Sequence, residues 1–192
     1  MTHKLMSYEM RRLKLISNFV KGNTVLDLGC SQLPNPFLDC FNTTGFDLVI
    51  NNDIESVYKE QIQGDINFID EKLFNRKFDT IICGELIEHV ENPYKVIRSL
   101  RNHLNTNGRL IVTTPNVISF PVLLIELLNM EKYFYSDEHK YLFSPRWVVK
   151  MMRDCGYTIV KIKPVGLWLY YFYIPLSFTT TSWQNVFVGE ID

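Results

Sequence analysis

The sequence lacks an apolar run long enough to cross a lipid bilayer. Its longest apolar stretch, Val165 to Phe178, is rich in aromatic residues and is interrupted by Pro175, whereas a membrane-spanning helix needs about 20 residues. Residues 1–12 carry charges and lack the apolar core and small-residue cleavage site of a signal peptide. We therefore expect neither a transmembrane segment nor export, and a cytoplasmic location.

The chain also lacks a strong net charge and a paired cysteine motif. Its formal net charge is −1, so it has no broad electrostatic attraction to nucleic acid. Its four cysteines stand apart without a CxxC pair, which favours reduced thiols. With 46% hydrophobic and 21% charged residues, the composition is that of a folded globular protein and excludes a disordered one.

No internal repeat, low-complexity tract or linker divides the 192 residues, so we expect a single domain, 1–192. Short apolar runs rich in β-formers alternate with helical patterns, which predicts a mainly parallel sheet. The expected strands are Thr24–Leu28, Thr44–Ile50, Lys77–Cys83, Arg109–Thr113, Tyr157–Ile162 and Asn185–Val188. The expected helices are an N-terminal one carrying Leu5, Leu13, Ile16, Phe19 and Val20, then Ile87–Leu104 and Ser144–Cys155.

Three short segments near the predicted strand ends suit a nucleotide-like ligand. In Asp27-Leu28-Gly29-Cys30-Ser31, the glycine lets the backbone approach a ligand, and the following amides can bind a carboxylate or phosphate. Asp47, about 20 residues further on, can accept hydrogen bonds from both hydroxyls of a ribose. Gly64-Asp65-Ile66 offers an acidic acceptor for an exocyclic amino group and an apolar side chain for an adenine face.

These segments, in the order VLDLGC, GFD, GDI, FDTIICGELIEHV and GRLIVTTPN, resemble class I S-adenosylmethionine-dependent methyltransferases from Val25 to about Tyr157. ELIEHVENP, TTPN and EHKYLFSPRWVVKMMRDCGY resemble the branch that contains quinone-biosynthesis and sugar O-methyltransferases. The resemblance implies an α/β fold: a three-layer, doubly wound, mostly parallel seven-stranded sheet of the Rossmann-like methyltransferase type. It also implies a cap insertion after the strand near 109–114, and S-adenosyl-L-methionine as the methyl donor.

The same resemblance assigns the cofactor-binding residues. Asp27 and Gly29 would shape the loop at the methionine end, Asp47 would bind the ribose, and Cys83 would lie beneath the sulfonium. The full set is Asp27, Gly29, Cys30, Ser31, Asp47, Asp65, Ile66 and Cys83.

The loop after the first strand departs from the family pattern. The family usually has GxGxG there, but Ser31 and Leu33 stand in place of the second and third glycines. Pro34 and Pro36 stiffen the same loop, because proline fixes its own φ angle. We therefore expect a local backbone path that differs from the usual turn.

A second group of polar residues follows the strand that ends at Cys83. Glu85, Glu88 and His89 have the spacing i, i+3 and i+4, which places them on one face of the expected helix. With His139 as a fourth ligand they could hold a divalent ion, and they resemble the Mg²⁺ site of quinone O-methyltransferases and of RNA 3′-end 2′-O-methyltransferases. Alternatively, the two glutamates cap the helix, or His89 and His139 act as general bases without a metal.

The stretch Asn116–Tyr141 is too long for a plain connection and is the expected substrate cap. Phe120–Met130 and Leu167–Phe178 supply more apolar surface than a sheet requires. This surface either closes over an apolar or carbohydrate acceptor, contacts a second copy in a homodimer, or touches a membrane surface peripherally.

Three functions remain open at this point. The leading one is O-methylation of a small-molecule or glycan hydroxyl. A second is a degenerate partner subunit without activity, which Ser31 and Leu33 suggest. A third is a metal-dependent RNA 3′-end methyltransferase, but this would require a basic groove, and Arg98, Arg101 and Arg109 are better explained as a solvated face.

Overall fold

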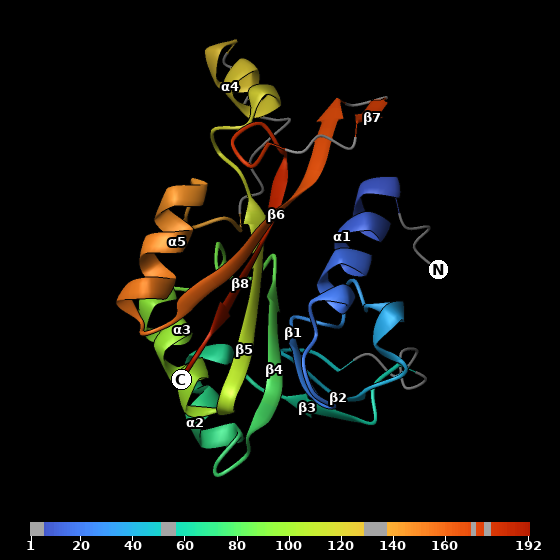
Figure 1. Ribbon diagram of the computed structural model, residues 1–192, viewed down its shortest axis with the longest axis vertical. Helices are drawn as coiled ribbons and strands as arrows, with labels where there is room; N and C mark the ends of the chain where they lie inside the picture. The colour runs from blue at the N-terminus through green and yellow to red at the C-terminus, as the bar shows by residue number, and fades with distance from the viewer. Residues whose placement is uncertain (1–5, 51–56, 129–137, 170–171, 175–177) are drawn as a thin grey trace.

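The computed structural model describes residues 6–50, 57–128, 138–169, 172–174 and 178–192, which form one β-sheet with helices on both faces (Figure 1). The strands are β1 Thr24–Leu28, β2 Asn42–Asp47, β3 Glu60–Gln63, β4 Phe78–Gly84, β5 Leu104–Pro115, β6 Thr158–Leu169, β7 Phe172–Ile174 and β8 Gln184–Glu190. The α-helices are α1 Ser7–Asn18, α2 Ile69–Lys72, α3 Pro93–Asn102, α4 Phe120–Leu127 and α5 Pro145–Asp154.

The sheet order is β3-β2-β1-β4-β5-β8-β6-β7. The first five of these strands are mutually parallel, and β8 lies antiparallel between β5 and β6. The seven strands from β3 to β6 confirm the predicted doubly wound, mostly parallel sheet. The short β7 pairs with β6 and adds an eighth strand.

Alternation along the central strands divides the core between the two faces of the sheet. Ile81 and Leu110 pack with residues of α2, α3 and α5, whereas the next residues, Ile82 and Ile111, pack with Leu13 and others on the face of α1. Successive strand side chains point to opposite faces, so each apolar run serves both layers. This explains why these strands are continuously apolar.

The third helix begins later than the sequence predicted. We expected it to start at Ile87, but residues 87–90 form turns and α3 starts at Pro93. The side chain of Asn92 accepts a hydrogen bond from the backbone N–H of Lys95 at 2.9 Å. A residue that precedes proline disfavours helical geometry, while proline suits the first helical position. The expected helix over 87–92 is therefore wrong.

Several strand boundaries also differ from expectation, and the edge strand β3 was not predicted. The second strand ends at Asp47 and not at Ile50, which places the Asp47 carboxylate at the strand's end. The edge strand β3 has the sequence EQIQ and is only partly buried, so it carries no apolar run that a pattern could detect. The last helix, in contrast, ends as expected before Gly156, whose φ is +87°.

Helix α4 projects from one end of the molecule (Figure 1), buries Pro121 and Val122, and exposes other apolar side chains. Phe120 is 58% exposed and Leu127 is 82% exposed. The remainder of the expected cap includes residues 129–137, which lie outside the described residues. In the part of the chain that the structure describes, no helix is both long and apolar enough to cross a membrane.

Asp79 joins the ends of strands far from the functional edge of the sheet. Its Oδ2 accepts hydrogen bonds from the backbone N–H groups of Asn23 and Thr24, each at 3.0 Å, and Oδ1 accepts one from Asn105 at 2.8 Å. These bonds, led by the one from Thr24, lower the pKa of Asp79 from 3.8 to about 2. The carboxylate therefore stabilises the fold above pH 4, and this stabilisation is lost as the pH falls towards 2.

We expect Asp79→Ala to lower the free energy of unfolding at pH 7 by about 1 to 3 kcal/mol, because two backbone donors lose their acceptor. The difference from the wild type should narrow at pH 3, where the wild-type carboxylate begins to protonate. Urea denaturation at both pH values measures this. Asp39→Ala, at an exposed position, is the control, and equal midpoints for Asp79→Ala and wild type at pH 7 would contradict the prediction.

Candidate functional site

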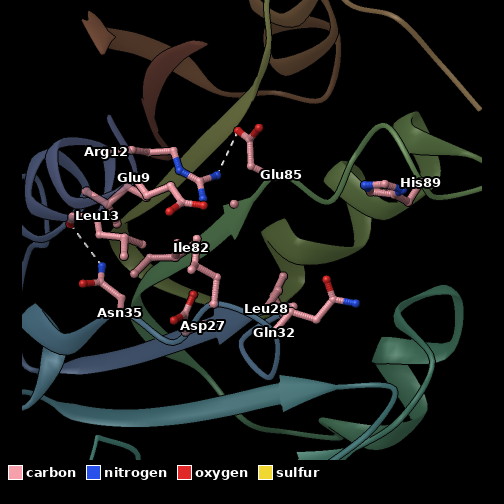
Figure 2. Close-up of a pocket in the computed structure, with 14 residues that line it drawn as sticks. Glu9, Arg12, Leu13, Asp27, Leu28, Gln32, Asn35, Ile82, Glu85 and His89 are labelled. Atoms are coloured by element: carbon pink, nitrogen blue, oxygen red, sulfur yellow. Dashed lines mark hydrogen bonds and ion pairs between the residues drawn. The ribbon is translucent and has the colours of Figure 1, made fainter. Parts of the chain in front are cut away.

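Two adjoining cavities lie at the carboxyl ends of the central strands. The first, about 370 Å³, lies between α1 and the ends of β1 and β4 (Figure 2). The second, about 260 Å³, lies beside the ends of β2 and β3. Gly29 and His89 line both. This edge, where the strand order reverses between β1 and β4, is the position at which open parallel sheets bind ligands.

The loop after β1 keeps a path close to the sheet although it lacks two glycines. Gly29 has φ +73°, in the left-handed region that favours glycine, and its N–H donates to the carbonyl of Phe46 at 2.9 Å. The N–H of Ser31 donates to Asp47 Oδ2 at 2.8 Å, and the Ser31 hydroxyl donates to the carbonyl of Val49. Serine at the second glycine position therefore ties the loop to the end of β2.

The first cavity is lined by both acidic and basic side chains from distant parts of the chain. Asp27 is 6% exposed and lines the cavity wall, and burial raises its pKa from 3.8 to about 7. Arg12, on α1, is also 6% exposed, and its guanidinium lies 3.1 Å from Glu85 Oε1. Figure 2 shows these side chains around one hollow. A ligand with both a carboxylate and an ammonium would find a complementary group for each.

Arg12 is the cavity residue that the sequence interpretation missed. From the sequence we expected the N-terminal helix only to pack on the sheet. The sequence does contain a signal, because Arg12 precedes Ile16 by four residues and therefore lies on the same, buried face of the helix. A buried arginine on an apolar face needs an anionic partner, which makes it a candidate for ligand binding.

The second cavity contains the residues expected at the ribose and adenine. Asp47, Asp65 and Ile66 line it together, which is the arrangement that the sequence predicted. Asp65 Oδ1 accepts hydrogen bonds from the backbone and side-chain nitrogens of Asn67, both at 2.8 Å, so this side chain is held by the turn that it begins. Leu48, 64% exposed, adds apolar surface to the cavity rim.

The two cysteines assigned to the cofactor do not line either cavity. Cys30 is 2% exposed and lies against Tyr58, and burial raises its pKa to about 12. Cys83 is fully buried in the core on the α3 side of the sheet. Both are small apolar packing residues here, while the adjacent Gly84 and Glu85 reach the cavity instead.

Glu85 is separated from the residues with which it was expected to share a helix face. It has φ +50°, and its carboxylate contacts Arg12 through Oε1 and accepts a 2.6 Å hydrogen bond from Gln184 Nε2 through Oε2. Because no helix forms here, the i, i+3, i+4 argument does not apply. The charge of Glu85 still acts on Glu88, but among the described residues Glu85 is not part of the group whose ligand atoms lie within 4.8 Å of one another.

Glu88, His89 and His139 do come together. One potential ligand atom from each lies within 4.8 Å of the others, and the two imidazole rings meet edge to face with centroids 4.7 Å apart. The backbone carbonyl of Glu88 accepts hydrogen bonds from the N–H groups of Lys140, at 2.8 Å, and Tyr141, at 3.2 Å. These bonds hold the segment after His139 against the loop that carries Glu88.

The cluster contains buried polar atoms that have no hydrogen-bond partner among the described residues. Glu88 is 2% exposed, and among the described residues neither of its carboxyl oxygens has a hydrogen-bond partner, nor does Nδ1 of His139. Burial and the nearby Glu85 charge raise the pKa of Glu88 well above its usual range. Burial and neighbouring His89 lower the pKa of His139, which favours its neutral form.

His89 has a defined tautomer in this arrangement. Its Nδ1 lies 3.2 Å from the backbone carbonyl of Glu138, and a carbonyl can only accept a hydrogen bond, so the proton is on Nδ1. The lone pair of Nε2 is then available to a ligand. Since His89 also lines both cavities, the cluster adjoins the predicted cofactor site.

Comparisons with known proteins identify the family of this chain. The chain matches the Methyltransferase domain family over residues 1–162. It is 32% identical, over 84% of its length, to the Ubiquinone biosynthesis O-methyltransferase of Rickettsia prowazekii (strain Madrid E), of which it covers 69%. Its fold is similar to that of a SAM-dependent methyltransferase from Archaeoglobus fulgidus, with TM-score 0.68, 16% identity and coverage of 96% of this chain and 94% of that one.

The fold is also similar to magnesium protoporphyrin IX methyltransferase from Synechocystis with bound S-adenosylhomocysteine, with TM-score 0.64, 14% identity and coverage of 100% and 90%. The family match covers most of the chain, and the cavities lie where the sheet reverses its order. The chain therefore belongs to the Methyltransferase domain family and is a class I S-adenosylmethionine-dependent methyltransferase.

Proposed function

We propose that the protein methylates a hydroxyl oxygen of a small molecule that has a second oxygen beside it, with a divalent cation on Glu88, His89 and His139. The observation that carries this proposal is the position of His89, which belongs to the three-residue cluster and lines both cavities. A cation there would lie next to the cofactor. The similarity to Ubiquinone biosynthesis O-methyltransferases supports oxygen as the methylated atom.

The residues fit a cation because they leave buried donor atoms unused. Both carboxyl oxygens of Glu88 and Nδ1 of His139 lack partners among the described residues, and buried groups of this kind are normally satisfied. Two imidazoles and one carboxylate suit Mn²⁺ or another first-row ion better than Mg²⁺, which prefers oxygen ligands. When bound, such an ion supplies a Lewis acid that lowers the pKa of an acceptor hydroxyl.

The chain's own residues position the methyl donor. Arg12 and Asp27 would bind the carboxylate and the ammonium of its methionine group, and Asp47 would accept hydrogen bonds from the ribose hydroxyls. Asp65 and Ile66 would contact the adenine edge and face. Methyl transfer is an in-line displacement, so alignment of acceptor and sulfonium contributes much of the rate.

We propose residues 116–141 as the cap over the acceptor. Val117, Tyr141 and Phe143 line a narrow crevice beside Glu88 and His139 that is closed to a water-sized molecule in this structure. The cap would have to open before these apolar and aromatic side chains could contact an acceptor ring whose oxygens point towards the cluster. The exposed apolar side chains of α4 extend the same type of surface and would suit an apolar substituent on the ring. Contact of this surface with a second copy or with a membrane stays a prediction.

Formation of S-adenosylhomocysteine from S-adenosylmethionine tests the proposal, using matched catechols and their mono-O-methyl ethers as acceptors. We expect turnover with the catechols, much less with the ethers, loss in chelator, and better recovery with Mn²⁺ than with Mg²⁺. Equal turnover in chelator would contradict the cation. Binding of S-adenosylhomocysteine without turnover of any hydroxyl acceptor would favour the partner-subunit hypothesis.

A further inference from the structure

Tyr58 is a buried tyrosine that binds a residue of the first cavity and has no role in the proposed function. It lies two residues before the start of β3 and is 3% exposed. Its hydroxyl donates a 2.7 Å hydrogen bond to Oδ2 of Asp27, which lines the first cavity. The Tyr58 hydroxyl binds only Oδ2, so it holds one oxygen of a carboxylate on the cavity wall and leaves Oδ1 as the oxygen that a ligand could bind.

The same hydroxyl is attached to the altered glycine loop. It accepts a hydrogen bond from the backbone N–H of Asn35 at 3.3 Å. Asn35 is 2% exposed, and its side chain donates to the carbonyl of Leu13 in α1 at 3.1 Å and accepts from the N–H of Phe37 at 3.1 Å. Tyr58 thus connects three parts of the cavity wall: α1, the loop after β1 and the end of β1.

The bulk of Tyr58 is also closely packed. Cys30 and Gly45 lie against its ring, and a Cβ on Gly45 would lie 3.2 Å from it and 2.8 Å from the sulfur of Cys30. The ring therefore has little freedom to move. A hydroxyl on a fixed ring holds its acceptor in one orientation.

We propose that Tyr58 is a positioning residue for cofactor binding: its hydroxyl fixes the Asp27 carboxylate so that the free oxygen binds the ammonium of the donor's methionine group. This inference rests on the proposed role of Asp27 at the methionine end. The loop after β1 lacks two of the family's glycines. The hydrogen bonds from the Asn35 N–H to Tyr58 and from Tyr58 to Asp27 orient the Asp27 carboxylate beside this loop.

The Tyr58 hydroxyl affects the pKa of Asp27, and several neighbouring groups affect the same pKa. The titratable groups that interact electrostatically with Asp27 are the following: Arg12 from α1, Asp47 from β2, Cys83 from β4, and the neighbouring Cys30 and Tyr58. Burial raises the pKa of Asp27 to about 7, while the hydrogen bond from Tyr58 and the charge of Arg12 act to lower it. Burial raises the pKa of Tyr58 itself, so the phenol stays a donor.

The test is the affinity for S-adenosylhomocysteine between pH 6 and pH 8.5, measured by calorimetry on wild type and Tyr58→Phe. In the wild type, affinity should rise as Asp27 ionises near pH 7. Without the hydroxyl the pKa of Asp27 rises further; a rise of about one unit weakens binding about fivefold at pH 7 and less than about twofold at pH 8.5. The affinity for 5′-methylthioadenosine, which has no ammonium, should not change.

Tyr157→Phe is the matched control. Tyr157 is also 3% exposed, and its hydroxyl donates a 3.0 Å hydrogen bond to the carbonyl of Ile97, away from both cavities. This variant loses a buried tyrosine hydrogen bond of the same kind, so it should be destabilised to a similar extent. Its pH profile for S-adenosylhomocysteine should be that of the wild type.

Three results would overturn the inference while leaving the methyltransferase assignment intact. One is a Tyr58→Phe protein that binds S-adenosylhomocysteine as the wild type does at every pH. Another is an equal loss of affinity for both ligands, which would indicate general damage to the cavity. If Tyr58→Phe does not fold, proton NMR of the Tyr58 hydroxyl in the wild-type protein decides: a slowly exchanging signal whose shift follows the ionisation of Asp27 supports the inference, and a hydroxyl in fast exchange with water overturns it. Wild-type protein that binds neither ligand would instead contradict the proposed site.

Discussion

Asp47→Ala is expected to weaken binding of S-adenosylhomocysteine by about 100-fold. Asp47 lies at the end of β2 and lines the second cavity, where its carboxylate can accept hydrogen bonds from two ribose hydroxyls. Hydrogen bonds to a charged group contribute about 1.5 to 3 kcal/mol each, and a combined loss near 3 kcal/mol corresponds to about 100-fold in affinity. The variant also removes the acceptor of the Ser31 N–H, so the loop after β1 loses a contact.

A graded series separates the two contributions. Asp47→Asn keeps one acceptor oxygen for the Ser31 N–H but removes the charge, and it should lose about tenfold. Asp154→Ala, at the end of α5 and paired with Lys150, is the control and should bind as the wild type does. Titration calorimetry with a parallel thermal unfolding scan measures both affinity and folding. Affinity of Asp47→Ala within threefold of the wild type would show that this side chain does not bind the ribose.

Glu88→Gln is expected to abolish cation binding and to reduce kcat/KM for a hydroxyl acceptor by at least about 100-fold. Glu88 supplies the only carboxylate of the cluster that the described residues form. A neutral amide is a poor cation ligand, and even changes to residues that support a ligand cost 10- to 100-fold. The free Mn²⁺ signal in electron paramagnetic resonance should disappear when wild-type protein is added but persist with Glu88→Gln.

Glu91→Gln is the control for this substitution. Glu91 follows three residues later, its side chain is 81% exposed, and it pairs weakly with Lys140 at 3.6 Å. It should bind Mn²⁺ and turn over as the wild type does. A wild-type protein that leaves the Mn²⁺ signal unchanged would remove the cation from the mechanism, and activity would then depend on His89 or His139 as a base. Affinity for S-adenosylhomocysteine should stay unchanged in both variants, because Glu88 does not line either cofactor cavity.

The central strands were predictable because burial on both faces requires an unbroken apolar run. Val25, Ile81 and Leu110 lie in such runs, and the structure places all three in the core. The edge strand β3 was not predictable in this way, since Gln61 and Ile62 are only partly covered and Gln63 is exposed. An edge strand owes its conformation to pairing with β2, which a local pattern does not contain.

The polar residues of the site also fall into two groups: those whose position the sequence pattern predicts and those whose position it does not. Asp27, Gly29 and Asp47 directly follow or end strands, so their place at the carboxyl edge follows from the strand pattern. The grouping of Glu85 with Glu88 rested on a helix that does not form, since Pro93 delays the start of α3. Glu85 instead faces Arg12, a residue 73 positions earlier.

The sequence by itself therefore determined the parallel sheet, the edge at which ligands bind and the order of the cofactor segments, because each depends on local periodicity and strand termination. Only the tertiary structure decided that Arg12 lines the same cavity as Asp27, that Tyr58 binds Asp27, and that His139 joins Glu88 and His89. These contacts join α1, β1, the segment before β3, the loop after β4 and the last residues of the expected cap. Which residues meet depends on how the helices and loops pack on the sheet, and the spacing of residues along the chain does not predict that packing.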